Sequence, residues 1–196
     1  EAHRQACLLY ERHLQNHPQH ADALQKLGVT YLQLKRDEEG LAKLEQALKF
    51  DDSLVDIHHN LASVYLHRRQ YQLALKHWLL QLKTAHDIDT LYNIGVTYSY
   101  LGRYEEATDY LFSVLKENPK HYESLVNLGA VYLQTNRRDL ACNYYHKAQA
   151  IRESPAISFV LKAIAGEKDI SSSPPEYVQD LFDQYASHYD EHLQNV

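Results

Sequence analysis

The sequence lacks several residues and patterns that common classes of protein require. Methionine is absent, and the 196 residues include only two cysteines, six glycines and five prolines. Cys7 and Cys142 lie far apart and form no CxxC motif, which argues against a disulfide framework and a zinc knuckle. So few glycines and prolines are unusual in a chain with many strands and turns. No apolar run approaches the ~18 residues of a membrane span, so we expect no membrane partner.

Positive charge is also in short supply. The chain has 20 lysines and arginines against 26 acidic residues, which gives a formal net charge of −6. Proteins that bind nucleic acids or anionic membranes generally present a basic face, so this balance argues against both kinds of partner. Because the sequence shows no signal-type start, we predict a cytoplasmic protein.

The 13 histidines do not assemble into a metal site on the evidence of spacing. His13, His17 and His20 have helical or turn spacing, and His58 and His59 are adjacent, but no Cys, Asp or Glu completes a ligand set. We therefore predict no metal site. The serines lie in turns or inside helices without a nucleophile elbow, so we predict no catalytic residues either.

What the sequence does contain is an internal repeat. Four tyrosines recur every 33 or 34 residues, each three places after a small residue: Tyr31, Tyr65, Tyr98 and Tyr132. A second small residue follows about nine places later, and a large residue four places beyond it; the large residues are Leu44, Trp78, Leu111 and Tyr145. Small residues at matching places let two helices approach closely, while larger side chains fill the space beside them. Each period therefore predicts a pair of antiparallel helices.

This pattern resembles the tetratricopeptide repeat (TPR). The resemblance implies an all-α fold, an α-solenoid of antiparallel helix pairs that forms a right-handed superhelix. The sequence departs from the family pattern at Gln81, where Ala is expected, and at Asp52 and Glu153, where Pro is common. The expected organisation is the second helix of a truncated unit at 1–20, four units at 21–54, 55–87, 88–121 and 122–155, a closing helix at 156–167, a linker at 168–175 and an amphipathic helix at 176–196.

The last segment carries a second resemblance. Residues 175–193 resemble the helix that joins a TPR array to an S-adenosylmethionine-dependent methyltransferase domain in a bacterial family. The resemblance implies that the chain is the N-terminal region of a longer enzyme, with four residues facing the missing domain: Tyr177, Phe182, Tyr185 and Tyr189. The six glycines form no G-x-G turn, so we expect S-adenosylmethionine in the parent protein and no cofactor in this chain. The alternative is an amphipathic cap on the stack.

Ligands of helical solenoids usually lie on the concave face, which the first helices would form. The residue before the central aliphatic residue of each first helix is Lys26, Asn60, Asn93 or Asn127. A carboxamide both donates and accepts hydrogen bonds, so such a ladder would hold the backbone of an extended peptide. The alternative is that each Asn bonds only the adjacent helix or water. The candidate peptide-binding groove comprises Lys26, His59, Asn60, Tyr92, Asn93, Tyr100, Asn127 and Gln134.

Two hypotheses about function follow. The first is a protein-protein interaction module that binds an extended peptide or a partner protein, as the non-catalytic region of a methyltransferase. The second is a stand-alone TPR scaffold that forms homo-oligomers through its exposed terminal helices.

Overall fold

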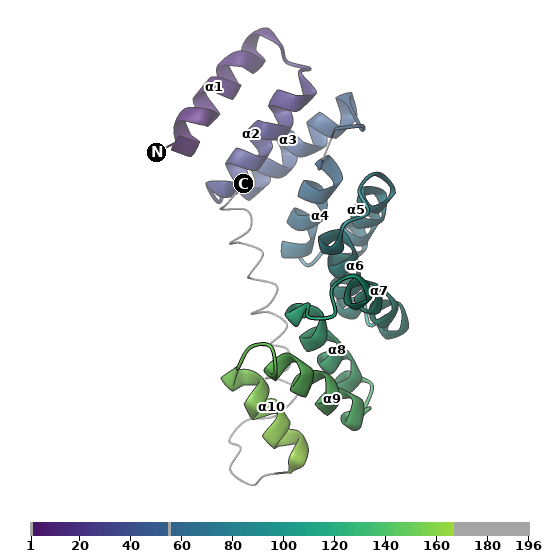
Figure 1. The fold of residues 1–196 in the computed structure, drawn as a ribbon. Helices are drawn as coiled ribbons and strands as arrows, with labels where there is room; N and C mark the ends of the chain where they lie inside the picture. The colour runs from purple at the N-terminus through teal and green to yellow at the C-terminus, as the bar shows by residue number, and fades with distance from the viewer. Residues whose placement is uncertain (1, 55, 167–196) are drawn as a thin grey trace. The chain divides into compact units, whose positions relative to one another are not determined.

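A computed structural model describes residues 2–54 and 56–166, which form ten α-helices and no strand (Figure 1). The helices are α1 (Ala2–Asn16), α2 (Ala21–Gln33), α3 (Asp37–Phe50), α4 (Ile57–His67), α5 (Tyr71–Thr84), α6 (Ile88–Tyr100), α7 (Tyr104–Glu117), α8 (Tyr122–Gln134), α9 (Arg138–Gln149) and α10 (Pro155–Ala165). None of these helices is both long and apolar enough to cross a bilayer.

The helices pack as antiparallel pairs, as the repeat predicts. The most extensive contacts join α2 to α3, α4 to α5, α6 to α7 and α8 to α9, while α1 packs on α2 and α10 on α9. The chain divides into two compact units, Glu1–His86 and Asp87–Val196. The predicted all-α fold of paired helices is confirmed for the described residues.

The small and large residues of the repeat meet at the centre of each pair. Leu44, Trp78, Leu111 and Tyr145 are completely buried. A Cβ atom added to Gly129 would lie 2.7 Å from the ring of Tyr145, and one added to Gly28 would lie 2.9 Å from Leu44. The small residue is therefore what allows the two helix backbones to approach.

Each helix pair is joined by the same tight turn. In every repeat, the middle residue between the two helices has a left-handed backbone, with φ between 56° and 71°. These residues are Lys35, Arg69, Gly102 and Asn136. The next residue then donates its backbone N–H to the carbonyl of the repeat tyrosine, as Arg137 does to Tyr132 at 2.7 Å. This bond fixes the direction in which the second helix leaves the turn.

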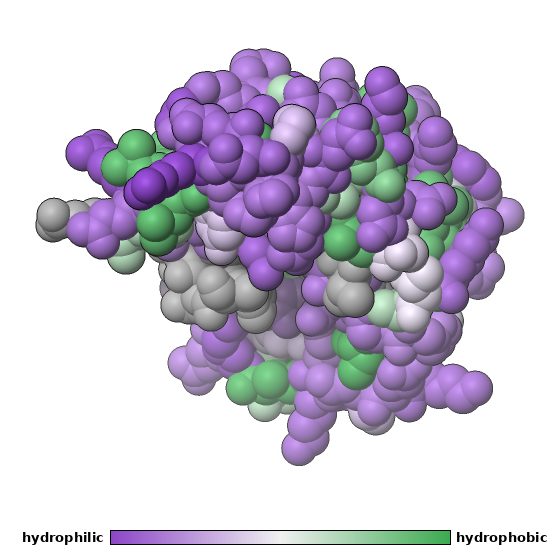
Figure 2. Space-filling model, turned by 90° about the horizontal axis from the view of Figure 1, so that it is seen from above, coloured by the Kyte–Doolittle hydropathy of each residue, from purple (hydrophilic) through white to green (hydrophobic). Residues whose placement is uncertain are grey.

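Hydrophilic residues cover most of the face in Figure 2, and hydrophobic residues appear there in small separate groups. Among the described residues, the large apolar side chains that remain exposed are Leu8, Leu9, Phe50, Leu73, Phe112, Leu140 and Ile151. Exposed apolar side chains that are scattered in this way are ordinary on a protein surface. Leu8 and Leu9 on α1 differ from the others in being consecutive in the sequence.

Candidate functional site

In the second unit, two successive first helices bring candidate groove residues together. Asn127 on α8 donates its Nδ2 hydrogens to the Tyr92 hydroxyl on α6 at 3.0 Å and to the backbone oxygen of Glu123 at 2.9 Å. Asn93 and Asn127 are only 1% and 2% exposed. The carboxamide of Asn127 thus fixes the Tyr92 ring in place, which is the local bonding that the sequence left open as an alternative.

The other candidates of this unit lie nearer to solvent. Tyr100 at the end of α6 is half-buried, and Gln134 at the end of α8 is exposed. Their place at the last turn of each first helix makes them available for contact with a ligand. Whether they bind one stays a prediction.

In the first unit, the candidates differ in how they are held. Lys26 is exposed and forms an ion pair with Asp22 at 2.9 Å, a contact that raises the pKa of Lys26. His59 and Asn60 are half-buried on α4, and the His59 ring lies edge-on to Trp78 with 5.0 Å between centroids. Asn60 forms no side-chain hydrogen bond within the described residues, so its carboxamide remains available.

The spacing argument missed a histidine pair in this unit, in which His77 is buried and His58 is half-buried. The Nδ1 atoms of His58 on α4 and His77 on α5 lie 3.0 Å apart, and the His77 ring stacks on Tyr65 with 5.4 Å between centroids. Burial lowers the pKa of His77 to about 4 and also lowers that of His58. A signal existed in the sequence, because His77 stands at the place where Tyr110 and Tyr144 stack on the tyrosine of their own repeats.

The structure shows what Gln81 does at the position where the family pattern has alanine. Its Oε1 accepts the backbone N–H of His59 at 3.2 Å, and its Nε2 donates to Asp56 Oδ1 at 3.2 Å. Helix α4 has no side-chain cap of its own at its N-terminus. The carboxamide on α5 therefore satisfies a backbone donor at the start of α4, a task that alanine could not perform.

Repeat tyrosines of the first unit tie each helix pair to the preceding second helix. Tyr31 donates its hydroxyl hydrogen to Glu11 on α1 at 2.5 Å, and Tyr65 donates to Glu45 on α3 at 2.7 Å. Burial first, and the bonded carboxylate second, raise the pKa of both tyrosines to about 12. The abundance of tyrosine thus serves packing and the contacts between repeats.

The histidines of α1 and its following turn also gather. His13 Nε2 lies 2.7 Å from His20 Nδ1, and the His17 ring centroid lies 4.8 Å from that of His13. Across residues 2–54 and 56–166, however, no three His, Cys, Asp or Glu side chains are placed so that they could hold a metal ion.

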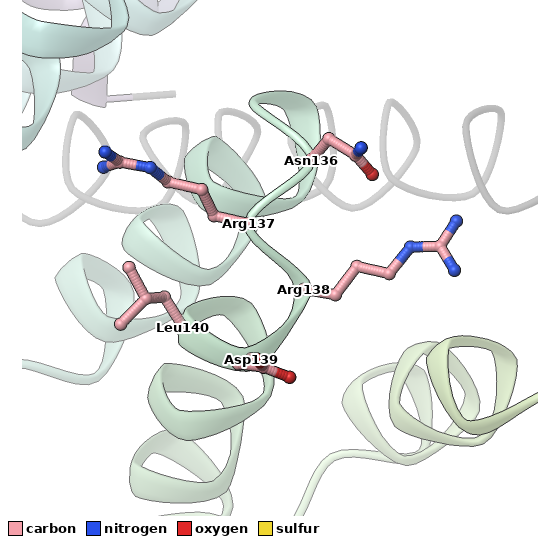
Figure 3. A pocket seen from close by; sticks show the side chains of 5 residues that line it. All are labelled: Asn136, Arg137, Arg138, Asp139 and Leu140. Carbon is pink, nitrogen blue, oxygen red and sulfur yellow. The ribbon is translucent and has the colours of Figure 1, made fainter.

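An open hollow of about 580 Å³ lies at the turn between α8 and α9 (Figure 3). Of the described residues, five consecutive ones line it: Asn136, Arg137, Arg138, Asp139 and Leu140. The periodicity of the sequence gave no reason to expect a hollow there, because it concerned only the residues that pack the repeats.

Models of the tetratricopeptide repeat family match residues 3–55, 88–121 and 122–155, more than half of the chain. The chain belongs to the tetratricopeptide repeat family. No curated protein matches this TPR protein significantly by sequence.

Solved TPR structures share its fold. YrrB, described as a TPR protein with an unusual peptide-binding site, aligns with a TM-score of 0.77 at 21% identity, covering 83% of this chain and 84% of YrrB. MamA aligns with a TM-score of 0.70 at 21% identity, covering 75% and 86%. MamA from Desulfovibrio magneticus RS-1 aligns with a TM-score of 0.73 at 16% identity, covering 79% and 88%. These likenesses establish the fold.

The residues predicted to face a missing domain are Tyr177, Phe182, Tyr185 and Tyr189, and they lie outside the described residues. The same holds for the predicted linker at 168–175 and the amphipathic helix at 176–196.

Proposed function

We propose that this TPR protein is an interaction module that binds an extended peptide or a segment of a partner protein on the faces of its first helices. The observation that carries the proposal is the recurrence of the TPR helix pair, which repeats one first-helix surface along the chain. YrrB, whose fold is similar, is described as having a peptide-binding site.

The candidate groove residues differ in burial, so we expect some to support helix packing and others to touch the peptide. Asn127 positions Tyr92, so its loss is expected to weaken the helix packing as well as any binding. Asn60 has an available carboxamide, and Tyr100 and Gln134 are accessible at helix ends. We expect Asn60 to touch a peptide bound to the first unit, and Tyr100 and Gln134 to touch a peptide bound to the second unit.

Peptides selected from a random 12-residue display library on the full chain provide the probe. Their affinity is then measured by fluorescence anisotropy for the wild type and for Asn60→Ala. We expect at least tenfold weaker binding with an unchanged melting temperature, since the Asn60 side chain supports no other group in the described structure. Asn143→Ala is the matched control, because Asn143 is an exposed asparagine on the second helix α9.

Hydrogen exchange maps the binding face without any substitution. A selected peptide should protect amides of α4, α6 or α8 more than those of α5, α7 and α9. Equal affinity for Asn60→Ala and wild type, together with protection confined to second helices, would contradict the proposal. So would a library from which no peptide is enriched.

A second candidate function, an assembly scaffold, is favoured by one observation. Leu8 and Leu9 on α1 are 65% and 68% exposed, the highest values among the exposed large apolar side chains of the described residues, and exposed apolar surface is what an association between chains would bury. The wild type should then show a mass that rises with concentration in light scattering, and Leu8→Lys with Leu9→Lys should remain monomeric. A wild-type mass independent of concentration would remove this candidate.

The connection to a methyltransferase stays a prediction. It rests on residues 175–193, outside the described part of the chain, and the matched family models and the structures named above are TPR proteins. S-adenosylmethionine as a cofactor of a parent protein is likewise a prediction. The scaffold hypothesis needs no such additional domain, and the comparisons support it better.

A further inference from the structure

The turn before three of the second helices places an arginine over the repeat tyrosine. Arg36, Arg103 and Arg137 precede α3, α7 and α9 with nearly the same φ, −97°, −89° and −95°. Their guanidinium carbons lie 4.1, 4.6 and 5.9 Å from the centroid of the ring beneath, which belongs to Tyr31, Tyr98 and Tyr132 respectively. The three arginines are therefore structurally equivalent.

At two of these sites a glutamate three residues later completes the arrangement. Arg36 donates from Nε and Nη2 to the two carboxylate oxygens of Glu39, at 2.6 and 2.5 Å. Arg103 donates from the same two nitrogens to Oε1 of Glu106, at 2.8 and 2.5 Å. The planar guanidinium fork is suited to holding a carboxylate in this way.

The third site has the arginine but no carboxylate three residues later. Leu140 stands three residues after Arg137 and is 39% exposed. Within the described part of the chain, the guanidinium of Arg137 forms no hydrogen bond or ion pair, and it lies farther from the ring of Tyr132 than its equivalents lie from their rings. Figure 3 shows Arg137 and Leu140 reaching to one side of the turn and Arg138 to the other, around the open hollow.

We propose that Arg137 and Leu140 form a subsite for a partner peptide in which an acidic side chain neighbours an apolar one. The carboxylate would take the position that Glu39 and Glu106 occupy in their own repeats, and the apolar side chain would pack against Leu140. Charge complementarity selects this occupant, because the fork offers parallel N–H donors and no acceptor. Asp139, which also lines the hollow, disfavours a dianionic phosphate relative to a carboxylate. This inference goes beyond the proposed function, because Leu140 lies on the second helix α9 and the subsite would be a contact additional to those of the first helices.

Nuclear magnetic resonance of the full chain, labelled with ¹⁵N in arginine, tests the subsite directly. The probe is the peptide acetyl-Leu-Glu-Leu-amide, and the matched control is acetyl-Leu-Gln-Leu-amide. We expect the Nε–H signal of Arg137 to move with the glutamate peptide alone. The signals of Arg36 and Arg103 should stay in place, because their forks are already occupied. This comparison within one spectrum requires no substitution.

Two surface substitutions exchange the residue that follows the arginine by three places between the Arg103 site and the Arg137 site. Leu140→Glu would supply from within the chain the carboxylate that the other repeats have, and should weaken peptide binding at Arg137 at least tenfold. Glu106→Leu would copy the Arg137 arrangement at Arg103, and the Arg103 signal should then respond to the peptide. Circular dichroism verifies that both variants are folded.

The subsite is refuted if Arg137 responds no more than Arg36 in the wild type, or if Leu140→Glu binds the peptide as the wild type does. It is also refuted if the glutamine peptide moves the Arg137 signal equally. These results would leave the proposed function standing wherever library-selected peptides still protect the first helices from exchange. Loss of that protection would instead refute the proposed function.

Discussion

The Nδ1 atoms of His58 and His77 face each other at 3.0 Å between α4 and α5, so one ring donates its N–H and the other accepts it in a hydrogen bond. A neutral pair or a singly protonated pair satisfies this geometry, whereas two imidazolium rings would present two donors and no acceptor. Asp52 after α3 and Lys76 on α5 act electrostatically on the pair. Glu45 on α3 accepts the hydroxyl hydrogen of Tyr65, and the Tyr65 ring stacks on His77.

We predict that acid destabilises the α4–α5 pair. The pKa of His77 is about 4 in the folded protein, lowered by burial from an ordinary value of 6.5. The unfolded chain therefore binds more protons between these values, so the free energy of unfolding should fall below pH 6.5 until about pH 4. The slope for His77 is roughly 1.4 kcal/mol per pH unit. Urea unfolding followed by the fluorescence of Trp78, the only tryptophan, measures it at each pH.

His77→Tyr identifies the group responsible, because tyrosine holds the equivalent place on α7 and α9. This variant should show a smaller pH dependence between 4 and 6.5 than the wild type. An identical slope for His77→Tyr and wild type would disprove the assignment.

Tyr65→Phe should destabilise the protein by about 1 kcal/mol, because it removes a hydrogen bond to the carboxylate of Glu45. Tyr132→Phe provides the comparison: it occupies the same place in its repeat, but its hydroxyl forms no hydrogen bond within the described structure. Its ring stacks on Tyr144 at 5.4 Å, an interaction that phenylalanine preserves. Chemical denaturation of both variants at pH 7 measures the difference, and equal losses would show that the bond to Glu45 contributes nothing.

Gly129→Ala should cost roughly 1–3 kcal/mol of stability, since the added Cβ would lie 2.7 Å from the rigid ring of Tyr145. Gly95→Ala should cost less, because the nearest atom there is Cγ of Leu111 at 3.0 Å, on a more adaptable side chain. The better helix propensity of alanine offsets part of both costs by ~1 kcal/mol. Thermal unfolding of the two variants ranks them, and a smaller loss for Gly129→Ala would contradict the packing argument.

The regular part of the fold could be predicted from the sequence for a simple reason. Residues such as Leu44 and Tyr145 recur at fixed spacing, because each helix pair must solve the same packing problem. Periodicity therefore predicted the helix pairs, and the structure confirms this paired-helix fold for the described residues.

Features specific to one repeat were harder to foresee, because they depend on side chains brought together from separate helices. The bonds of Gln81 to the start of α4 and of His58 to His77 join side chains on different helices, and the spacing of the repeat does not say which partners meet. The same limit applies to the site. Asn127 fitted the pattern of a peptide ladder, but its bond to Tyr92 depends on how α6 and α8 pack. Arg137 stood out only after its turn could be compared with the equivalent turns.

The junctions between successive helix pairs differ in their chemistry. Within the first unit, tyrosine hydroxyls bond to Glu11 and Glu45, and such contacts respond to proton and salt concentration. In the second unit, Phe112 on α7 meets Tyr144 on α9 with 6.1 Å between centroids, a contact between rings that carry no charge at neutral pH. A change in pH or salt concentration would therefore loosen these two junctions of the first unit more than it would loosen this ring contact of the second unit.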